Sequence, residues 1–102
     1  MVVDFEVDPR LGPDWQKQVM NRIYLQLAFA EREIQTLTVS VELEAGATLF
    51  ACKLIAELVS GETDVVEMRG ADASICFADG TARLSRTIRR RSRLSHARAV
   101  LH

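Results

Sequence analysis

Residues 36–58 read TLTVSVELEAGATLFACKLIAEL, and in this stretch two runs of alternating apolar and polar side chains flank a short connection. Leu37, Val39 and Val41 fall on one face of the first run, as Cys52 and Leu54 do in the second. A period of two residues is typical of a strand with one buried face. Because the connection at residues 45–47 is so short, we expect the two strands to form an antiparallel hairpin.

One further strand is expected on each side of this hairpin. Val3, Phe5 and Val7 alternate with acidic residues until Pro9 interrupts the pattern. After a turn at residues 60–62, alternation resumes over residues 63–69 and stops at Gly70. The sequence therefore predicts four strands.

Two segments carry apolar residues at helical spacing instead. The stripes consist of Trp15, Val19, Ile23 and Leu27 in the first segment and of Phe77, Thr81, Leu84 and Ile88 in the second. We expect the first helix to run from about Asp14, as its cap, to about Arg32, and Asp72 to cap the second helix. Gly80 is unfavourable inside the second helix by about 1 kcal/mol relative to alanine.

The order of these elements predicts an α+β fold of the type β-α-β-β-β-α. A four-stranded sheet with both helices packed on one face buries every apolar stripe. A chain of 102 residues is long enough for one core, so we expect a single domain over residues 1–94. Residues 95–102 form a tail that either extends the last helix or frays.

Charge is distributed unevenly along the chain. Residues 1–70 contain twelve acids and six bases, whereas residues 71–102 contain two acids and seven arginines. A basic pole of this kind usually indicates an acidic partner.

The arginines of the second helix form one face. Arg83, Arg86, Arg90 and Arg93 occupy an arc of about 80° opposite the apolar stripe, and Arg89 and Arg91 flank that arc. Basic residues near a helix C-terminus also favour the helix dipole, but one or two would suffice for that. The planar guanidinium suits phosphate, so a nucleic-acid backbone is the favoured partner.

RNA is favoured over a particular DNA sequence because no helix-turn-helix, zinc-finger or basic-zipper spacing is present. Lys17 and Arg22 are the candidate contacts on the first helix, although Lys17 serves equally well as a solubilising residue. Aromatic stacking platforms are poorly represented, and Trp15 and Phe77 are better explained as core.

Leu25 and Phe29 point away from the Trp15 stripe and predict an exposed apolar patch. This patch could serve as a second contact surface or as a homodimer seam, or it could show that the helix is covered on two sides.

Nothing in the sequence indicates catalysis, a metal site or a cofactor. His96 and His102 lie in the tail, no phosphate-binding glycine loop is present, and Cys52 and Cys76 are interpreted as reduced core thiols. The chain has no apolar run long enough to span a membrane and no secretory leader, so we expect a cytoplasmic, non-enzymatic protein.

The order of elements resembles the ribosome hibernation-promoting factor family, which includes the ribosome-associated inhibitor RaiA. The resemblance covers roughly residues 3–93 and is carried by residues 52–61, 65–67 and 71–73, by Arg83-Leu84 and by the final arginine run. It implies a fold similar to double-stranded RNA-binding domains and binding to the small ribosomal subunit near the tRNA and mRNA channel. It also implies a short form of the family, without the dimerisation domain of the long members.

By position, Arg83, Arg86, Arg90 and Arg93 match the RNA-contacting face of the family's last helix, and Lys17 and Arg22 match the first helix loosely. We therefore expect a stress-response protein that binds ribosomal RNA and modulates translation or hibernation. The alternative is a protein-interaction or self-associating module. In that case the arginine face would bind an acidic partner or a second copy, with Leu25 and Phe29 as the apolar anchor.

Overall fold

The predicted hairpin forms β2 (Ile34–Leu43) and β3 (Phe50–Leu58) in the computed structural model, which describes residues 1–44 and 48–101, with side chains up to residue 91. The two strands are antiparallel, with Val39 opposite Leu54 and Val41 opposite Cys52. The expected connection at residues 45–47 lies outside the described residues. The hairpin is therefore confirmed, and β2 begins two residues earlier than the alternation suggested.

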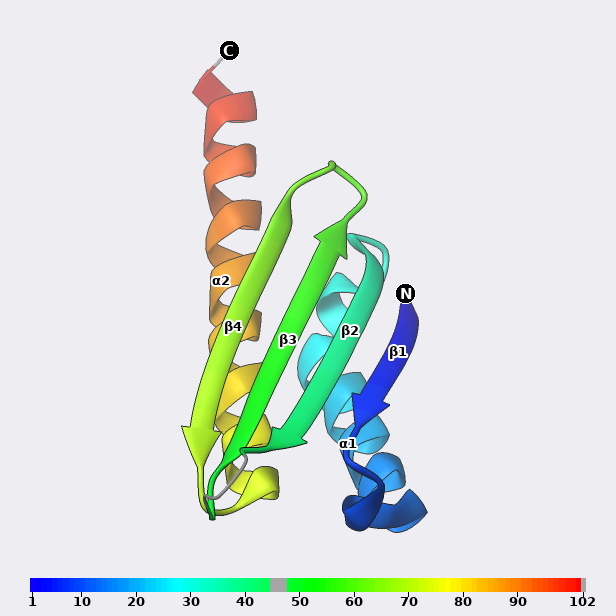
Figure 1. The fold of residues 1–102 in the computed structure, drawn as a ribbon. Helices are drawn as coiled ribbons and strands as arrows, with labels where there is room; N and C mark the ends of the chain where they lie inside the picture. The colour runs from blue at the N-terminus through cyan, green and yellow to red at the C-terminus, as the bar shows by residue number, and fades with distance from the viewer. Residues whose placement is uncertain (45–47, 102) are drawn as a thin grey trace.

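The other two strands are the edges of the sheet, whose order is β1-β2-β3-β4 (Figure 1). β1 (Val2–Val7) pairs in parallel with β2, as a strand must when a helix carries the chain back across the sheet. β4 (Thr63–Gly70) pairs antiparallel with β3 after a tight turn in which Gly61 has a φ of 94°. That positive φ is accessible to glycine without steric cost.

Both helices lie on the same face of the sheet (Figure 1). α1 (Gly12–Leu27) and α2 (Ala73–Leu101) run in the same direction, and the C-terminal turns of α2 extend past the sheet. The two predicted apolar stripes are buried against each other and against the strands. The rings of Trp15 and Phe77 meet edge to face with centroids 6.0 Å apart, and Trp15 Nε1 donates to Ser74 Oγ at 3.1 Å.

The predicted boundaries of the first helix were wrong at both ends. α1 begins at Gly12, and Asp14 makes no capping hydrogen bond, although its carboxylate still lies in the first turn. The capping carboxylate nearby is Asp8, which accepts from Arg10 N at 3.0 Å and so caps η1 (Pro9–Leu11). The Arg10 guanidinium also donates to this carboxylate, from Nε at 2.9 Å and from Nη2 at 2.6 Å, and together with the backbone hydrogen bond it holds the pKa of Asp8 well below its usual range.

At its C-terminal end, the helix stops at Leu27 and continues as a 3₁₀ turn, η2 (Ala28–Ala30), instead of reaching Arg32. The chain must turn there because Ile34, which starts β2, is almost fully buried. Phe29 consequently lies in a turn and not on a regular helix.

The predicted start of the second helix is confirmed. Asp72 accepts hydrogen bonds from Ser74 N at 2.9 Å and Ile75 N at 3.1 Å, which is the geometry of an N-cap. Gly80 also has a packing role: a Cβ there would lie 3.1 Å from Leu54 Cδ1. Glycine lets α2 approach β3 closely, which offsets its low helix propensity.

Candidate nucleic-acid interface

Arg83, Arg86 and Arg90, which we call the cationic face, are exposed on the side of α2 that borders the edge strand β4. With Thr87 they line a groove of about 300 Å³ whose other wall consists of Val65, Val66 and Glu67 of β4, and the Glu67 carboxylate pairs with Lys53 at 3.6 Å. None of the three arginines forms an ion pair with another described residue, and α2 has no acidic residue after Asp79, one turn before Arg83. The cationic face is therefore free to bind an external anion.

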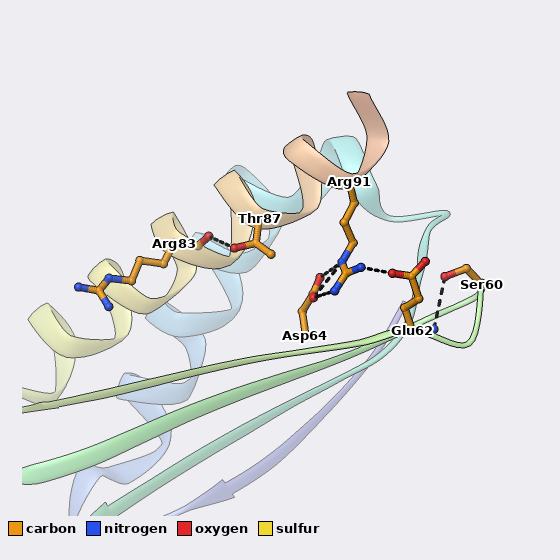
Figure 2. A network of polar contacts seen from close by, with 6 residues as sticks. All are labelled: Ser60, Glu62, Asp64, Arg83, Thr87 and Arg91. Atoms are coloured by element: carbon orange, nitrogen blue, oxygen red, sulfur yellow. Dashed lines mark hydrogen bonds and ion pairs between the residues drawn. The ribbon is translucent and has the colours of Figure 1, made fainter. Parts of the chain in front are cut away.

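Arg91 does not belong to this face, contrary to the expectation that it flanks the arc. Its Nε lies 2.9 Å and 3.0 Å from the two carboxylate oxygens of Asp64, and its Nη1 pairs with Glu62 (Figure 2). Asp64 is only 6% exposed, and burial raises the pKa of its carboxyl. Arg91 therefore neutralises a buried carboxylate and joins α2 to the turn before β4.

The sequence contained a signal for this pair that the helical wheel did not use. Asp64, Val66 and Met68 share the inward face of β4, so the alternation itself places a carboxylate where apolar residues belong. A buried carboxylate requires hydrogen-bond donors or a base as partner, and an arginine supplies both the donors and the charge. Arg83 instead extends away from this network, and Thr87 Oγ1 donates to its backbone carbonyl at 3.0 Å (Figure 2).

Arg89 is exposed, but its guanidinium lies over the ring of Phe29, 4.1 Å from the ring centroid. Leu25 and Phe29 are 84% and 44% exposed, so the predicted apolar patch is confirmed. Tyr24, which the sequence reasoning missed, is also exposed. The apolar patch is thus joined to the arginine helix through Arg89 and is not a separate surface.

The two candidates on α1 are not equivalent. Arg22 lines a groove of about 330 Å³ between the helices, together with Gln18 and Asn21 of α1 and with Ser74 of α2. Lys17 is exposed but is five residues from Arg22, about 140° around the helix. Of the two α1 candidates, only Arg22 therefore lies next to residues of α2. The remaining candidate, Arg93, belongs to α2, but the structure describes side chains only up to residue 91.

The uneven charge along the sequence becomes a difference between two faces. The side chains of the sheet that point away from the helices form the open face, and its exposed charges are mostly acidic: Asp4, Glu6, Glu42, Glu57 and Glu67, against Lys53 and Arg69. Lys53 and Arg69 are both engaged by carboxylates, at 3.6 Å and 2.9 Å. The helix side is therefore the side that attracts anions.

Cys52 and Cys76 are buried free thiols, and burial raises the pKa of Cys52 to about 12, which keeps it protonated and unreactive. No group of three metal-ligating side chains is found among residues 1–44 and 48–91. No helix in the described chain is long and apolar enough to cross a membrane.

Two solved structures have the same fold. The N-terminal domain of Protein Y from Thermus thermophilus matches with a TM-score of 0.72 and 15% identity, over 88% of this chain and 98% of its own. A ribosomal subunit interface protein from Coxiella burnetii matches with a TM-score of 0.77 and 10% identity, over 90% of this chain and 98% of its own. No protein-family model and no curated protein matches the sequence. The β-α-β-β-β-α architecture predicted from the sequence is therefore confirmed, and it is the fold of these two proteins.

Proposed function

We propose that this protein is a non-enzymatic, ribosome-associated RNA-binding protein that modulates translation. The observation that carries the proposal is the cationic face, where Arg83, Arg86 and Arg90 line one groove without carboxylate partners among the described residues. The name of the Coxiella burnetii protein, which has the same fold, supports the ribosome as the partner. Such a role places the protein in the cytoplasm.

In this proposal the guanidinium groups of the cationic face bind phosphates of ribosomal RNA on the small subunit. Each arginine can donate two parallel hydrogen bonds to one phosphate, and the resulting contacts position the protein without reading bases. Arg22 adds a donor from α1 at the groove between the helices. A protein held there would occupy ribosomal surface that translating ribosomes need.

Co-sedimentation tests the proposal directly. In a sucrose gradient at low salt, the wild-type protein is expected to migrate with small ribosomal subunits, and the variant Arg86→Glu/Arg90→Glu is expected to remain at the top. The matched control is Lys53→Glu, which reverses a charge on the open face and should still co-sediment. Wild-type protein that stays at the top of the gradient would overturn the proposal.

A second candidate function is self-association, because one face of the molecule is cationic and the opposite, open face is acidic. A contact between these two different faces is heterologous, so it would build open chains, or rings where the rotation closes, and not a two-fold homodimer. Light scattering distinguishes the two candidates. A mass that grows with concentration, falls with salt and ignores added RNA would favour self-association.

A further inference from the structure

We propose that Phe29 and Arg89, which we call the stacking pair, form a binding site for an unpaired nucleobase. The inference rests on the proposed function, because it names the form of RNA that the surface recognises. It also revises the sequence-based expectation that aromatic stacking platforms are poorly represented in this chain.

The geometry of the stacking pair supports this role. The guanidinium carbon of Arg89 lies 4.1 Å from the Phe29 ring centroid, and Phe29 remains 44% exposed with that group in place. Leu25, one turn earlier on α1, is 84% exposed. Nucleobases stack on both aromatic rings and arginine planes, so a base that contacts this pair finds two suitable surfaces at once.

The stacking pair is also close to the phosphate-binding groups. Arg86 and Arg89 are three residues apart on α2, which makes them neighbours on the helix surface, about 5–6 Å between Cβ atoms. Arg86 belongs to the cationic face that lines the groove against β4. One strand of RNA can therefore contact Arg86 through a phosphate and the stacking pair through a base.

The chemistry of the patch favours a base over an apolar protein surface. A protein that covered Phe29 would have to bury the charge of Arg89, which no described carboxylate neutralises. A base leaves the guanidinium edge in water and adds a cation–π contact. Bases inside a duplex are already stacked, so the expected ligand is a loop, bulge or single strand.

The test compares a single-stranded hexauridylate with the matched strand that lacks bases and keeps its phosphates. Wild-type protein should bind the base-containing strand more tightly, and Phe29→Leu, which keeps only the Arg89 plane, should lose most of this difference between the strands. Loss of one stacked base corresponds to a decrease of roughly 5- to 150-fold in affinity. Leu keeps the site apolar and leaves the phosphate contacts in place. Comparing the two proteins on the two strands therefore separates the contribution of the aromatic ring to affinity from that of the phosphates.

Tyr24→Leu is the matched control, since Tyr24 is an exposed aromatic residue of α1 outside the stacking pair. It should discriminate between the two strands as the wild type does, and thermal unfolding should show that both variants are folded. Equal discrimination by Phe29→Leu and wild type would overturn the stacking site. The stacking site would also be overturned if Tyr24→Leu lost as much of the preference for the base-containing strand as Phe29→Leu does. The same holds if light scattering shows that the only effect of Phe29→Leu is to disrupt a dimer. Each of these results leaves wild-type co-sedimentation with small subunits unchanged, so the proposed function is judged separately.

Discussion

At the scale of single residues, the charges of this protein are determined by what each side chain contacts. Arg91 and Arg83 are both on α2, yet Arg91 is paired with Asp64 and Glu62, whereas Arg83 has no ion pair with a described residue. Arg89 lies between these cases, since it contacts an aromatic ring and remains exposed. A count of arginines therefore overstates the number of cations available to a phosphate backbone.

Burial has a second consequence at this scale, at Cys52. Burial, together with the neighbouring Cys76, raises the pKa of Cys52 from about 9 to about 12. Between these values the unfolded chain has lost the thiol proton and the folded chain has kept it, so stability falls as the pH rises. The slope should approach about 1.4 kcal/mol per pH unit above pH ~9.

Urea unfolding at several pH values between about 7 and 10 measures this effect. The wild type should lose more free energy of unfolding above pH ~9 than Cys52→Ala, which lacks the thiol, while the two curves run parallel near pH 7. Parallel curves over the whole range would show that the Cys52 thiol titrates normally in the folded protein.

At the scale of elements, the Arg91 network fixes the position of α2 on the sheet. It connects Arg91, the last residue of α2 whose side chain is described, to Asp64 in β4 and to Glu62 in the preceding turn (Figure 2). The cationic face lies on the preceding turns of the same helix, from Arg83 to Arg90, the residue next to Arg91. The direction in which Arg83, Arg86 and Arg90 point therefore depends on this anchor.

Removing Arg91 should destabilise the domain because it leaves the Asp64 carboxylate buried without a partner. For Arg91→Met we expect a loss of about 1–3 kcal/mol in the free energy of unfolding, since the arginine itself is partly exposed. The double variant Arg91→Met/Asp64→Leu should recover most of this loss. Urea unfolding is the measurement.

Arg83→Met is the control for that experiment, because it removes an exposed arginine without an ion pair and should change stability by no more than about 0.5 kcal/mol. Equal losses in Arg83→Met and Arg91→Met would contradict a specific role for the Asp64 pair.

At the scale of the whole molecule, the two faces of the domain carry opposite charge. The open face of the sheet presents most of the exposed acids, and the helix side presents the unpaired arginines. The small formal net charge of −1 therefore hides a strongly polarised molecule. Long-range attraction to RNA would orient the helix side toward it before contact.

The salt dependence of binding to small ribosomal subunits should report the number of phosphates contacted. Each neutralised phosphate contributes roughly 0.7 to 0.9 to the slope of log affinity against log salt. The three arginines of the cationic face together predict a slope of about −2 to −3, and Arg86→Ala should reduce its magnitude by about 1.

Arg69→Ala is the control here, because it removes the same charge from the open face, where Glu44 already pairs with that guanidinium at 2.9 Å. Its slope should equal that of the wild type. A slope that Arg86→Ala leaves unchanged would mean that this arginine binds no phosphate.

The sequence alone determined the elements and the core, because both follow from local periodicity. Alternation predicted the strands, four-residue spacing predicted which side chains α1 and α2 bury, and Asp72 marked the start of α2. Exposure of Leu25 and Phe29 followed from the same wheel. These features depend on neighbours within a few residues, which is the range that a sequence pattern reports.

Only the tertiary structure decided which charges are free. Asp64 and Arg91 are 27 residues apart, and Phe29 and Arg89 come from different ends of the chain, so no local pattern pairs them. The parallel pairing of β1 with β2 and the close approach at Gly80 were decided in the same way. The physical reason is that ion pairs and ring contacts act over a few ångströms, and packing of the helices on the sheet determines which distant residues come that close.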